Sequence, residues 1–407
     1  MAKITWLVPG LIEGSGGHRT ILQHADFLQR QGHETTIHLE NPLGQSDAML
    51  RSAIRRTFGF DFPCVRGGWS NVVPADMVFA TIWYSAQAVR DLPFDCIRCY
   101  FVQDYEAMFN AVGSAYVMAE NSYRYGLHPI AIGRWLPVKL AENFGIESAC
   151  FDFCSDLDVY RRTAPYRHNP SVCFIHQPEK PRRCAELGIE ALGIVKHRMP
   201  EVKVVLYGSK THSRVWFEHE NLELIDLPSC NALYNRSGVG LCISTTNPSR
   251  IPFEMMAAGL PVVEVHAPNT VYDLPAGTAS LCEPTPESLA KGMLEILANP
   301  ERAAAMSRAG ERFMRDRPLA FGLEQFGRTV AGLLDGRPFD AARPEKMYRE
   351  PPVRFDPRTE VRVDAHSPTV ASDWIALDTP GGRLGFLPKP LRIAARKGYR
   401  ALRRRRT

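Results

Sequence analysis

Several common signatures are missing from this chain of 407 residues. It has no run of 18 apolar residues, so the sequence predicts no membrane-spanning helix. Its early glycine-rich loop, GLIEGSGGHRTI, lacks the G-x-G-x-x-G spacing of a dinucleotide site and contains no Walker Lys-Ser/Thr pair. The N-terminal MAKITWLVPG is broken by Pro9 and lacks a small-residue cleavage site. We therefore interpret it as a first strand and expect no signal peptide.

The ten cysteines are scattered, which favours free thiols over a disulfide framework. Cys96-x-x-Cys99 and Cys150-x-x-x-Cys154 resemble zinc-ligand spacings. The first pair lies in or beside the apolar stretch FDCIRCYFV, where strand alternation points the two side chains to opposite faces. Buried, unreactive thiols are therefore the favoured interpretation.

Strand-like and helix-like segments alternate along the chain, which predicts parallel sheets and an α/β fold with two Rossmann-like domains. The size of the chain also favours two domains, and 45% apolar with 23% charged residues is typical of a globular protein. We expect domains at 1–165 and 166–335, followed by an extended segment and tail at 336–407. The strands are expected at 3–9, 35–40, 77–82, 98–102, 129–132, 150–153, 172–175, 202–206, 222–225, 241–244 and 261–265. The clearest helices are expected at about 18–31, 134–144, 184–196, 253–258, 285–298, 300–315 and 324–334.

The most informative stretch is 240–265, GLCISTTNPSRIPFEMMAAGLPVVEV, which predicts a strand, a polar loop, a short helix, a glycine cap and a second strand. Backbone N–H groups from Ser249 to Phe253, at the start of the helix, would suit a phosphate. Glu254, in the first helical turn, would accept hydroxyls of a ribose. The alternative is that Glu254 only complements the helix dipole.

Two groups in the first half are candidates for binding or catalysis. Gly16 and Gly17 lie where a strand turns into a helix, so the backbone can approach a ligand closely, although a plain tight turn is the alternative. Asp104 and Glu106 follow the carboxyl end of a strand, where ligands bind in doubly wound sheets. A carboxylate there can act as an acid, a base or a hydroxyl acceptor, and a helix N-cap is the alternative for Asp104.

The second half places cations after its first strand, in the loop HQPEKPRR. Lys180, Arg182 and Arg183 would meet a diphosphate there, and a solvated loop is the alternative. Gly208, which follows the next strand, is assigned to the same nucleotide site.

The last 17 residues, 391–407, carry eight Lys or Arg and no acid, against a net charge of +5 for the whole chain. Leu391, Ala395, Tyr399 and Leu402 would share one helical face, which favours an amphipathic helix on an anionic membrane surface. A disordered basic tail, or one touching nucleic acid nonspecifically, is the alternative. We expect a cytoplasmic protein, peripheral at the inner face of the plasma membrane, with no specific nucleic-acid partner.

The pattern P-S-x-x-P-x-E-M-M-A-x-G-x-P-V around Glu254 resembles the nucleotide-binding signature of glycosyltransferase family 4, whose members have the GT-B fold. Gly16–Ile21, Phe101–Glu106, and Pro181–Arg183 with Glu186–Gly188 make the chain most similar to bacterial rhamnosyltransferases of surface-polysaccharide and S-layer glycan synthesis.

The resemblance implies a donor, dTDP-L-rhamnose, and an acceptor, a growing glycan on a lipid or nucleotide carrier. It also implies retention of anomeric configuration without a metal or other cofactor. Asp156-x-Asp158, a possible metal motif, would instead belong to the interdomain linker. In this view Asp104, Lys180 and Arg182 act in catalysis, while the glycines, Ser249, Phe253, Glu254 and Arg183 bind the donor.

One departure from the family pattern is that Thr246 stands where many members have a first glutamate, eight positions before Glu254. That glutamate usually contacts the donor sugar. A nucleotide-sugar epimerase on the same fold and a non-catalytic scaffold in glycan synthesis are the competing functions.

Overall fold

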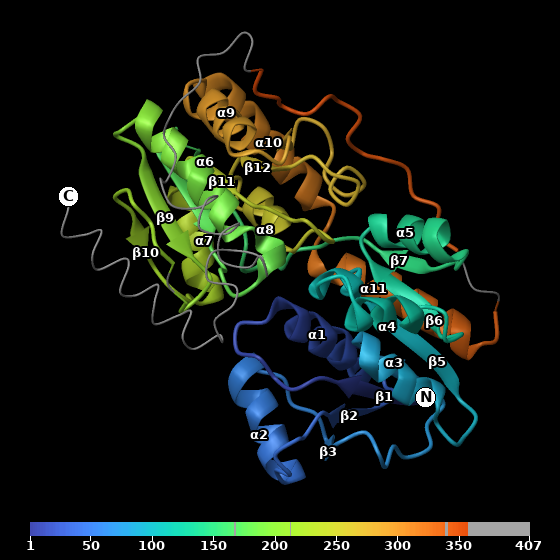
Figure 1. Ribbon diagram of the computed structural model, residues 1–407. Helices are drawn as coiled ribbons and strands as arrows, with labels where there is room; N and C mark the ends of the chain where they lie inside the picture. The colour runs from blue at the N-terminus through green and yellow to red at the C-terminus, as the bar shows by residue number, and fades with distance from the viewer. Residues whose placement is uncertain (167, 212, 338–340, 357–407) are drawn as a thin grey trace, which may run out of the picture. The chain divides into compact units, whose positions relative to one another are not determined.

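The protein contains two parallel β-sheets flanked by helices (Figure 1). The computed structural model describes residues 1–166, 168–211, 213–337 and 341–356, which lie within one compact unit. The first sheet has the order β3-β2-β1-β4-β5-β6-β7 and the second β10-β9-β8-β11-β12-β13. Each sheet reverses its strand order beside its first strand, and such switch points are where open α/β sheets bind ligands.

The strands of the first sheet are β1 (Lys3–Val8), β2 (Glu34–Leu39), β3 (Cys64–Gly67), β4 (Met77–Ala80), β5 (Ile97–Val102), β6 (His128–Ile132) and β7 (Ala149–Phe151). Those of the second are β8 (Ser171–Ile175), β9 (Lys203–Tyr207), β10 (Glu220–Asn221), β11 (Val239–Leu241), β12 (Val262–Val265) and β13 (Ala279–Cys282). Most are nearly continuous apolar runs, because helices cover a parallel sheet on both faces.

The helices begin and end largely where side-chain caps and glycines favour it. Ser15, Ser46, Asp226, Thr285 and Asn299 each accept a backbone N–H of the first helical turn. The helices are α1 (Gly16–Arg30), α2 (Asp47–Phe58), α3 (Trp83–Arg90), α4 (Ser114–Ser122), α5 (Trp135–Phe144), α6 (Ala185–Arg198), α7 (Leu227–Arg236), α8 (Ile251–Ala257), α9 (Pro286–Leu297), α10 (Pro300–Arg315) and α11 (Leu319–Leu334). Short 3₁₀ turns, η1 (Glu106–Phe109) and η2 (Pro181–Arg183), follow β5 and β8.

Helix α11 packs against the first sheet, although its sequence follows the second (Figure 1). Phe326 is fully buried, with its ring centroid 6.0 Å from that of Trp6, 5.6 Å from Phe101 and 5.9 Å from Phe151. The expectation of a helix at 324–334 is confirmed, with a start five residues earlier. The first lobe is therefore built from two separate stretches of chain.

The segment 341–356 runs without helix or strand along both sheets. Ala342 N–H donates to the Ser148 carbonyl, Tyr348 N–H to that of Val271, and Val353 N–H to that of Leu281. This agrees with the extended segment expected after the second domain, as far as the described residues reach. The predicted amphipathic helix at 391–407 lies outside them.

Some predicted elements differ from the structure. The strand expected at 222–225 is wrong: β10 ends at Asn221, and Glu223 has φ 55°, which breaks an extended strand. The strand expected at 241–244 is instead β11, which ends at Leu241, and the Ser244 N–H donates to a carboxylate of Glu264. The sequence interpretation also missed α2, α3, α4, β3 and β13. All ten cysteines are free, and Cys99 is fully buried.

Candidate functional site

Asp104 links the carboxyl ends of the two sheets. Its carboxylate accepts the hydroxyl of Thr246 at 2.9 Å and the backbone N–H of Asn247 at 2.8 Å, and both residues follow β11 in the other lobe. It also accepts the N–H of Tyr105, so it does not act as a helix N-cap by the usual i+2 or i+3 bond. Burial raises the pKa of Asp104, and the Arg182 guanidinium opposes this shift.

The basic loop after β8 lies beside this carboxylate. Arg182 Nε is 3.9 Å from Asp104 Oδ2, and the guanidinium stacks over the Phe109 ring at 4.3 Å. Lys180 precedes the η2 turn, and burial lowers its pKa, as do the charges of Arg182 and Arg183. The structure thus brings together three of the predicted site residues, two cations and a carboxylate, where the lobes meet. The two cations, Lys180 and Arg182, would suit a polyanionic ligand.

Arg183 contacts its own lobe, through Ser244 and the buried Glu264. One guanidinium nitrogen, Nη1, donates to Ser244 Oγ at 3.0 Å. Ser244 in turn donates its hydroxyl to Glu264 at 2.9 Å and its backbone N–H to the same carboxylate at 2.9 Å. Glu264 is fully buried in β12, and sequence reasoning missed it. A glutamate between valines in the strand VVEV was the available signal.

The predicted glycines lie at turns that favour glycine or at a helix start. Gly208 has φ +103°, and a Cβ there would lie 2.9 Å from Ile175 Cγ1, so a side chain would be strained. Its carbonyl accepts the amide of Gln177 at 3.0 Å, which joins the ends of β8 and β9. Gly16 and Gly17 open α1, and both are exposed. A Cβ on Gly17 would lie 3.7 Å from the side chain of Gln103, the neighbour of Asp104.

Glu254 lies in the first turn of α8, as predicted, and none of the hydrogen bonds described above for Arg182 and Arg183 involves it. Burial raises its pKa, while Arg250, a hydrogen bond with Tyr160 and Arg19 lower it. Arg19 belongs to α1, so the Glu254 environment includes charge from the opposite lobe. The carboxylate is thus held in a polar setting in which a sugar hydroxyl could replace or join the tyrosine.

Ser249 and Phe253 flank the start of α8. Ser249 Oγ accepts the N–H of Ile251 at 3.4 Å. The Phe253 ring is buried and stacks on Phe153 of the first lobe, with centroids 4.6 Å apart. Its side chain is therefore packed in the core and is not available to contact a ligand.

Further bonds join the lobes and were not foreseen from the sequence. The Asn247 amide donates to the carbonyls of Gln103 at 2.9 Å and Ile132 at 3.0 Å. In the opposite sense, Asp273 of the second lobe accepts the backbone N–H of Arg134 at 2.9 Å, just before α5. Each lobe thus supplies a buried carboxylate to donors of the other lobe. No local sequence pattern marks such bonds, because their partners are more than 100 residues apart.

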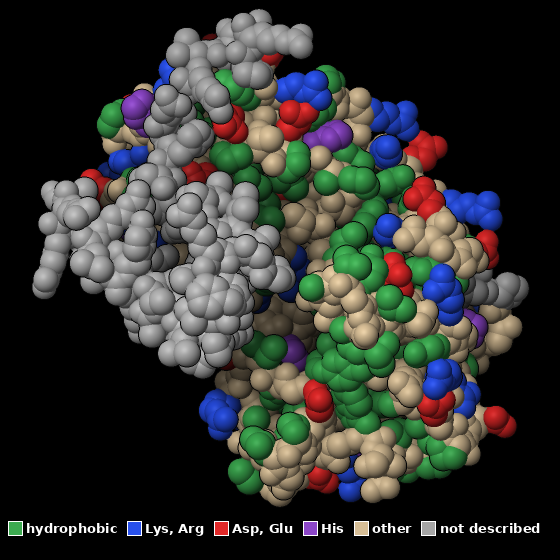
Figure 2. All heavy atoms as spheres, in the orientation of Figure 1, with side chains coloured by type: hydrophobic (Ala, Val, Ile, Leu, Met, Phe, Trp, Pro, Cys, Tyr) green, Lys and Arg blue, Asp and Glu red, His purple; other side chains and the backbone are tan. Residues whose placement is uncertain are grey.

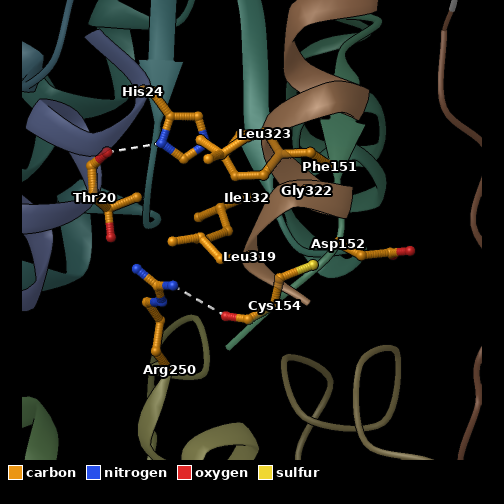
Figure 3. Close-up of a pocket in the computed structure, with 10 residues that line it drawn as sticks. All are labelled: Thr20, His24, Ile132, Phe151, Asp152, Cys154, Arg250, Leu319, Gly322 and Leu323. Carbon is orange, nitrogen blue, oxygen red and sulfur yellow. Dashed lines mark hydrogen bonds between the residues drawn. The ribbon is translucent and has the colours of Figure 1, made fainter. Parts of the chain in front are cut away.

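A small cavity lies between α1, β7, α11 and the loop before α8 (Figure 3). Arg250 reaches into it and donates to the Cys154 carbonyl at 3.1 Å, while His24 Nδ1 donates to the Thr20 carbonyl at 2.7 Å. Burial lowers the pKa of His24 to about 3. The cavity volume of about 10 Å³ is near that of one water, so it is not a nucleotide-sugar site.

The surface drawn in Figure 2 carries basic, acidic and hydrophobic side chains interspersed with one another. Among the residues that the structure describes, no cluster of three or more His, Cys, Asp or Glu could hold a metal ion. Within that same part of the chain, no helix is both long and apolar enough to cross a bilayer.

Solved structures with a similar fold define the class. A variant of S. aureus TarM, in complex with Fondaparinux, alpha-GlcNAc-glycerol and UDP, matches with a TM-score of 0.65 and 8% identity, over 82% of this chain and 100% of that one. A putative UDP-N-acetylglucosamine 2-epimerase from Listeria monocytogenes matches with a TM-score of 0.58 and 11% identity, over 85% and 100%. At these identities the likeness shows the fold alone, which is GT-B: two Rossmann-like domains, each around a parallel sheet.

Two similarities in sequence connect the chain to proteins with known names. Residues 170–294 match the family model of the WsaF C-terminal domain. The O-antigen biosynthesis protein RfbC of Myxococcus xanthus is 31% identical over an alignment of 354 residues, which covers 82% of this chain and 28% of that protein. The chain therefore spans little more than a quarter of that relative. The chain is thus similar in sequence to an O-antigen biosynthesis protein and to the WsaF C-terminal domain, and it has the GT-B fold.

Proposed function

We propose that this protein transfers a hexosyl group from a nucleotide diphosphate sugar to a growing cell-surface glycan. The observation that carries the proposal is the cluster of Arg182 and Asp104 where the lobes meet, with Lys180 and Arg183 in the same loop. The similarity to an O-antigen biosynthesis protein supports the acceptor class. A rhamnosyl group from dTDP-L-rhamnose is the favoured donor, from the resemblance around Glu254.

The cations have a direct role in this reaction. As the glycosidic bond breaks, negative charge grows on the leaving diphosphate, and fixed positive charges aimed at it lower the barrier. Lys180, Arg182 and Arg183 supply that charge from one loop. Asp104 orients an acceptor or donor-sugar hydroxyl, and the leaving phosphate takes the acceptor proton, so the transfer proceeds with retention and without a metal ion.

Thr246 changes how the protein would contact the donor sugar. Its hydroxyl donates to Asp104, so a carboxylate from the first lobe lies 2.9 Å from the position where relatives carry their first glutamate. Asp104 thereby supplies from the other lobe a negative charge that the loop itself lacks. A sugar hydroxyl entering the site would compete with Thr246 for this acceptor.

A thermal-shift panel of dTDP, UDP, GDP and their sugars tests the nucleotide, because a ligand that binds only the folded state raises its melting temperature. Glu254 can meet two hydroxyls of a ribose but only one of a deoxyribose. We expect a shift with dTDP and dTDP-L-rhamnose. A shift only with UDP or GDP compounds would contradict the rhamnosyl donor, and no shift with any nucleotide would contradict the proposed function.

Glu254→Ala tests the ribose contact. Loss of one or two charge-assisted hydrogen bonds is expected to weaken nucleotide binding by about tenfold or more. The matched control is Glu287→Ala, which removes an acid from the first turn of another helix of the same lobe, α9. Equal and small effects of the two variants would show that Glu254 only complements a helix dipole.

Release of nucleoside diphosphate separates the competing functions. A transferase releases it in proportion to added acceptor glycan, whereas an epimerase converts donor with no acceptor present. A scaffold binds without turnover. The epimerase with the same fold makes this measurement necessary, because the fold does not distinguish the two reactions.

Residues 391–407 are proposed to hold the enzyme at an anionic membrane surface, at the inner face of the plasma membrane, where a lipid-linked acceptor would lie. The support is their eight Lys or Arg without an acid. Sedimentation with vesicles containing anionic lipid, compared with neutral vesicles, tests this. Equal binding of the full chain and of a chain ending at residue 390 would contradict it.

A further inference from the structure

Glu264 is a buried charge that the proposed mechanism leaves without a role. It lies in the middle of β12, between Val263 and Val265, and is fully buried. An ionised carboxylate in such a place is costly unless it is hydrogen-bonded. Three donors meet it: the Ser244 hydroxyl at 2.9 Å, the Ser244 N–H at 2.9 Å and the Val265 N–H at 2.8 Å. Two of the three come from one residue, Ser244.

The direction of the hydrogen bonds through Ser244 follows from the groups themselves. An arginine can only donate, so Ser244 Oγ must accept from Arg183 Nη1. The serine has one hydroxyl proton, and Glu264 accepts it. Ser244 is itself fully buried, so water does not compete for these bonds. The result is a chain from a buried carboxylate, through one hydroxyl, to the guanidinium of Arg183.

Arg182 and Arg183 are neighbours held in different ways. Arg182 faces the first lobe through Phe109 and Asp104, whereas Arg183 is tied to its own lobe through Ser244. Ser244 uses one of the five N–H donors of Arg183 and so restricts the orientation of the guanidinium. A guanidinium fixed in this way loses less freedom when it binds a phosphate.

We infer that Glu264, acting through Ser244, is a positioning residue that orients Arg183 toward the diphosphate of the nucleotide sugar. This rests on the proposed function, because it assigns Arg183 to that diphosphate. It extends the function by distinguishing two of the cations: Arg183 is oriented by its own lobe, and Arg182 depends on contact with the first lobe.

The test is a double-mutant cycle on nucleotide binding with Ser244→Ala and Arg183→Ala, using dTDP and UDP as probes by titration calorimetry. Ser244→Ala leaves the bonds from the two backbone N–H groups to Glu264 in place. We expect Arg183→Ala to weaken diphosphate binding by about tenfold or more and Ser244→Ala by several-fold. The double variant should bind no more weakly than Arg183→Ala, because both remove the same interaction.

Thymidine and uridine, which lack the diphosphate, provide a readout that a merely structural role would not match. Their affinities should be unchanged in all variants, and melting temperatures confirm folding. Ser280→Ala is the matched control, because it removes an equally buried serine hydroxyl from the neighbouring strand β13 without touching Arg183. It should bind as wild type does.

The outcomes are distinguishable. If the wild-type protein binds neither dTDP nor UDP, the proposed function fails. If it binds them and Ser244→Ala binds as tightly as wild type, the inference fails alone. Additive losses in the double variant, or equal losses for nucleoside and diphosphate, would also overturn it, since Ser244 would then act through the fold and not through Arg183.

Discussion

Replacing Phe326 with alanine should lower the stability of the first lobe, although this residue follows the whole second sheet in sequence. Phe326 is fully buried, and its ring centroid lies within about 6 Å of five other rings, those of Trp6, His24, Phe79, Phe101 and Phe151. Large aromatic neighbours cannot collapse into the space that it leaves. The expected loss is therefore about 3–5 kcal/mol in the free energy of unfolding, the range for phenylalanine-to-alanine changes in cores.

Urea unfolding followed by tryptophan fluorescence is the assay, because Trp6 stacks on Phe79 at 4.2 Å within the same cluster. Glu324→Ala is the control, since this exposed residue lies on the same helix and its replacement should change stability by less than about 0.5 kcal/mol. A loss below about 1 kcal/mol for Phe326→Ala would refute the view that α11 completes the core of the first lobe.

Three further changes test other parts of the structure. Gly188→Ala would place a Cβ 2.2 Å from Phe174 Cζ, and such overpacking should cost about 1–3 kcal/mol, so an unchanged melting temperature would be contrary evidence. Burial raises the pKa of Asp273 from 3.8 to about 7, so the folded protein binds this proton more tightly than the unfolded chain, and stability is lost as pH rises between those values. Asp273→Asn should remove up to about 4 kcal/mol of that loss. The measurement is the free energy of unfolding from urea titrations at pH 4 and pH 8, and parallel pH dependences of the wild type and the variant would contradict the prediction. Asp104→Asn should lower kcat about 100-fold with the fold intact, because the neutral amide cannot accept as strongly, and full transferase activity would assign Asp104 a purely structural role.

The sequence predicted the fold well because its signals are local. Apolar runs of strand length and the glycine stop at Gly259, with φ +75°, each depend on a few neighbouring residues. The misses have physical causes. Helix α2 has a polar composition and only three buried residues, so its apolar pattern is weak. Strand β13 has the short sequence ASLC, whose local pattern is weak. It is a strand because it is buried and pairs with β12.

The candidate site residues were singled out one by one in the sequence, and their arrangement was not predicted. The cation loop and Asp104 were found because both follow strand ends, and parallel strands bring such ends to one edge. The bonds of Asp104 with Thr246 and Asn247 were not predictable, since they span more than 100 residues. Glu264 was missed because a carboxylate inside an apolar strand has no fixed partner in sequence. The roles assigned to Asp104, the cation loop, Glu254 and the glycines all stay predictions until nucleotide binding and transfer are measured.

The position of α11 also bears on the order in which the protein can fold as it is synthesised. The first lobe's strands emerge first, yet the ring that fills their core is at residue 326, so this lobe must wait for almost the whole described chain. The second sheet, from 171 to 282 with α9 and α10, is continuous in sequence and can be complete before then. Truncated chains that end after residue 315, released from the ribosome, should therefore contain a protected second lobe and a protease-sensitive first one. A stop codon between 316 and 326 would harm the lobe farthest from it in sequence.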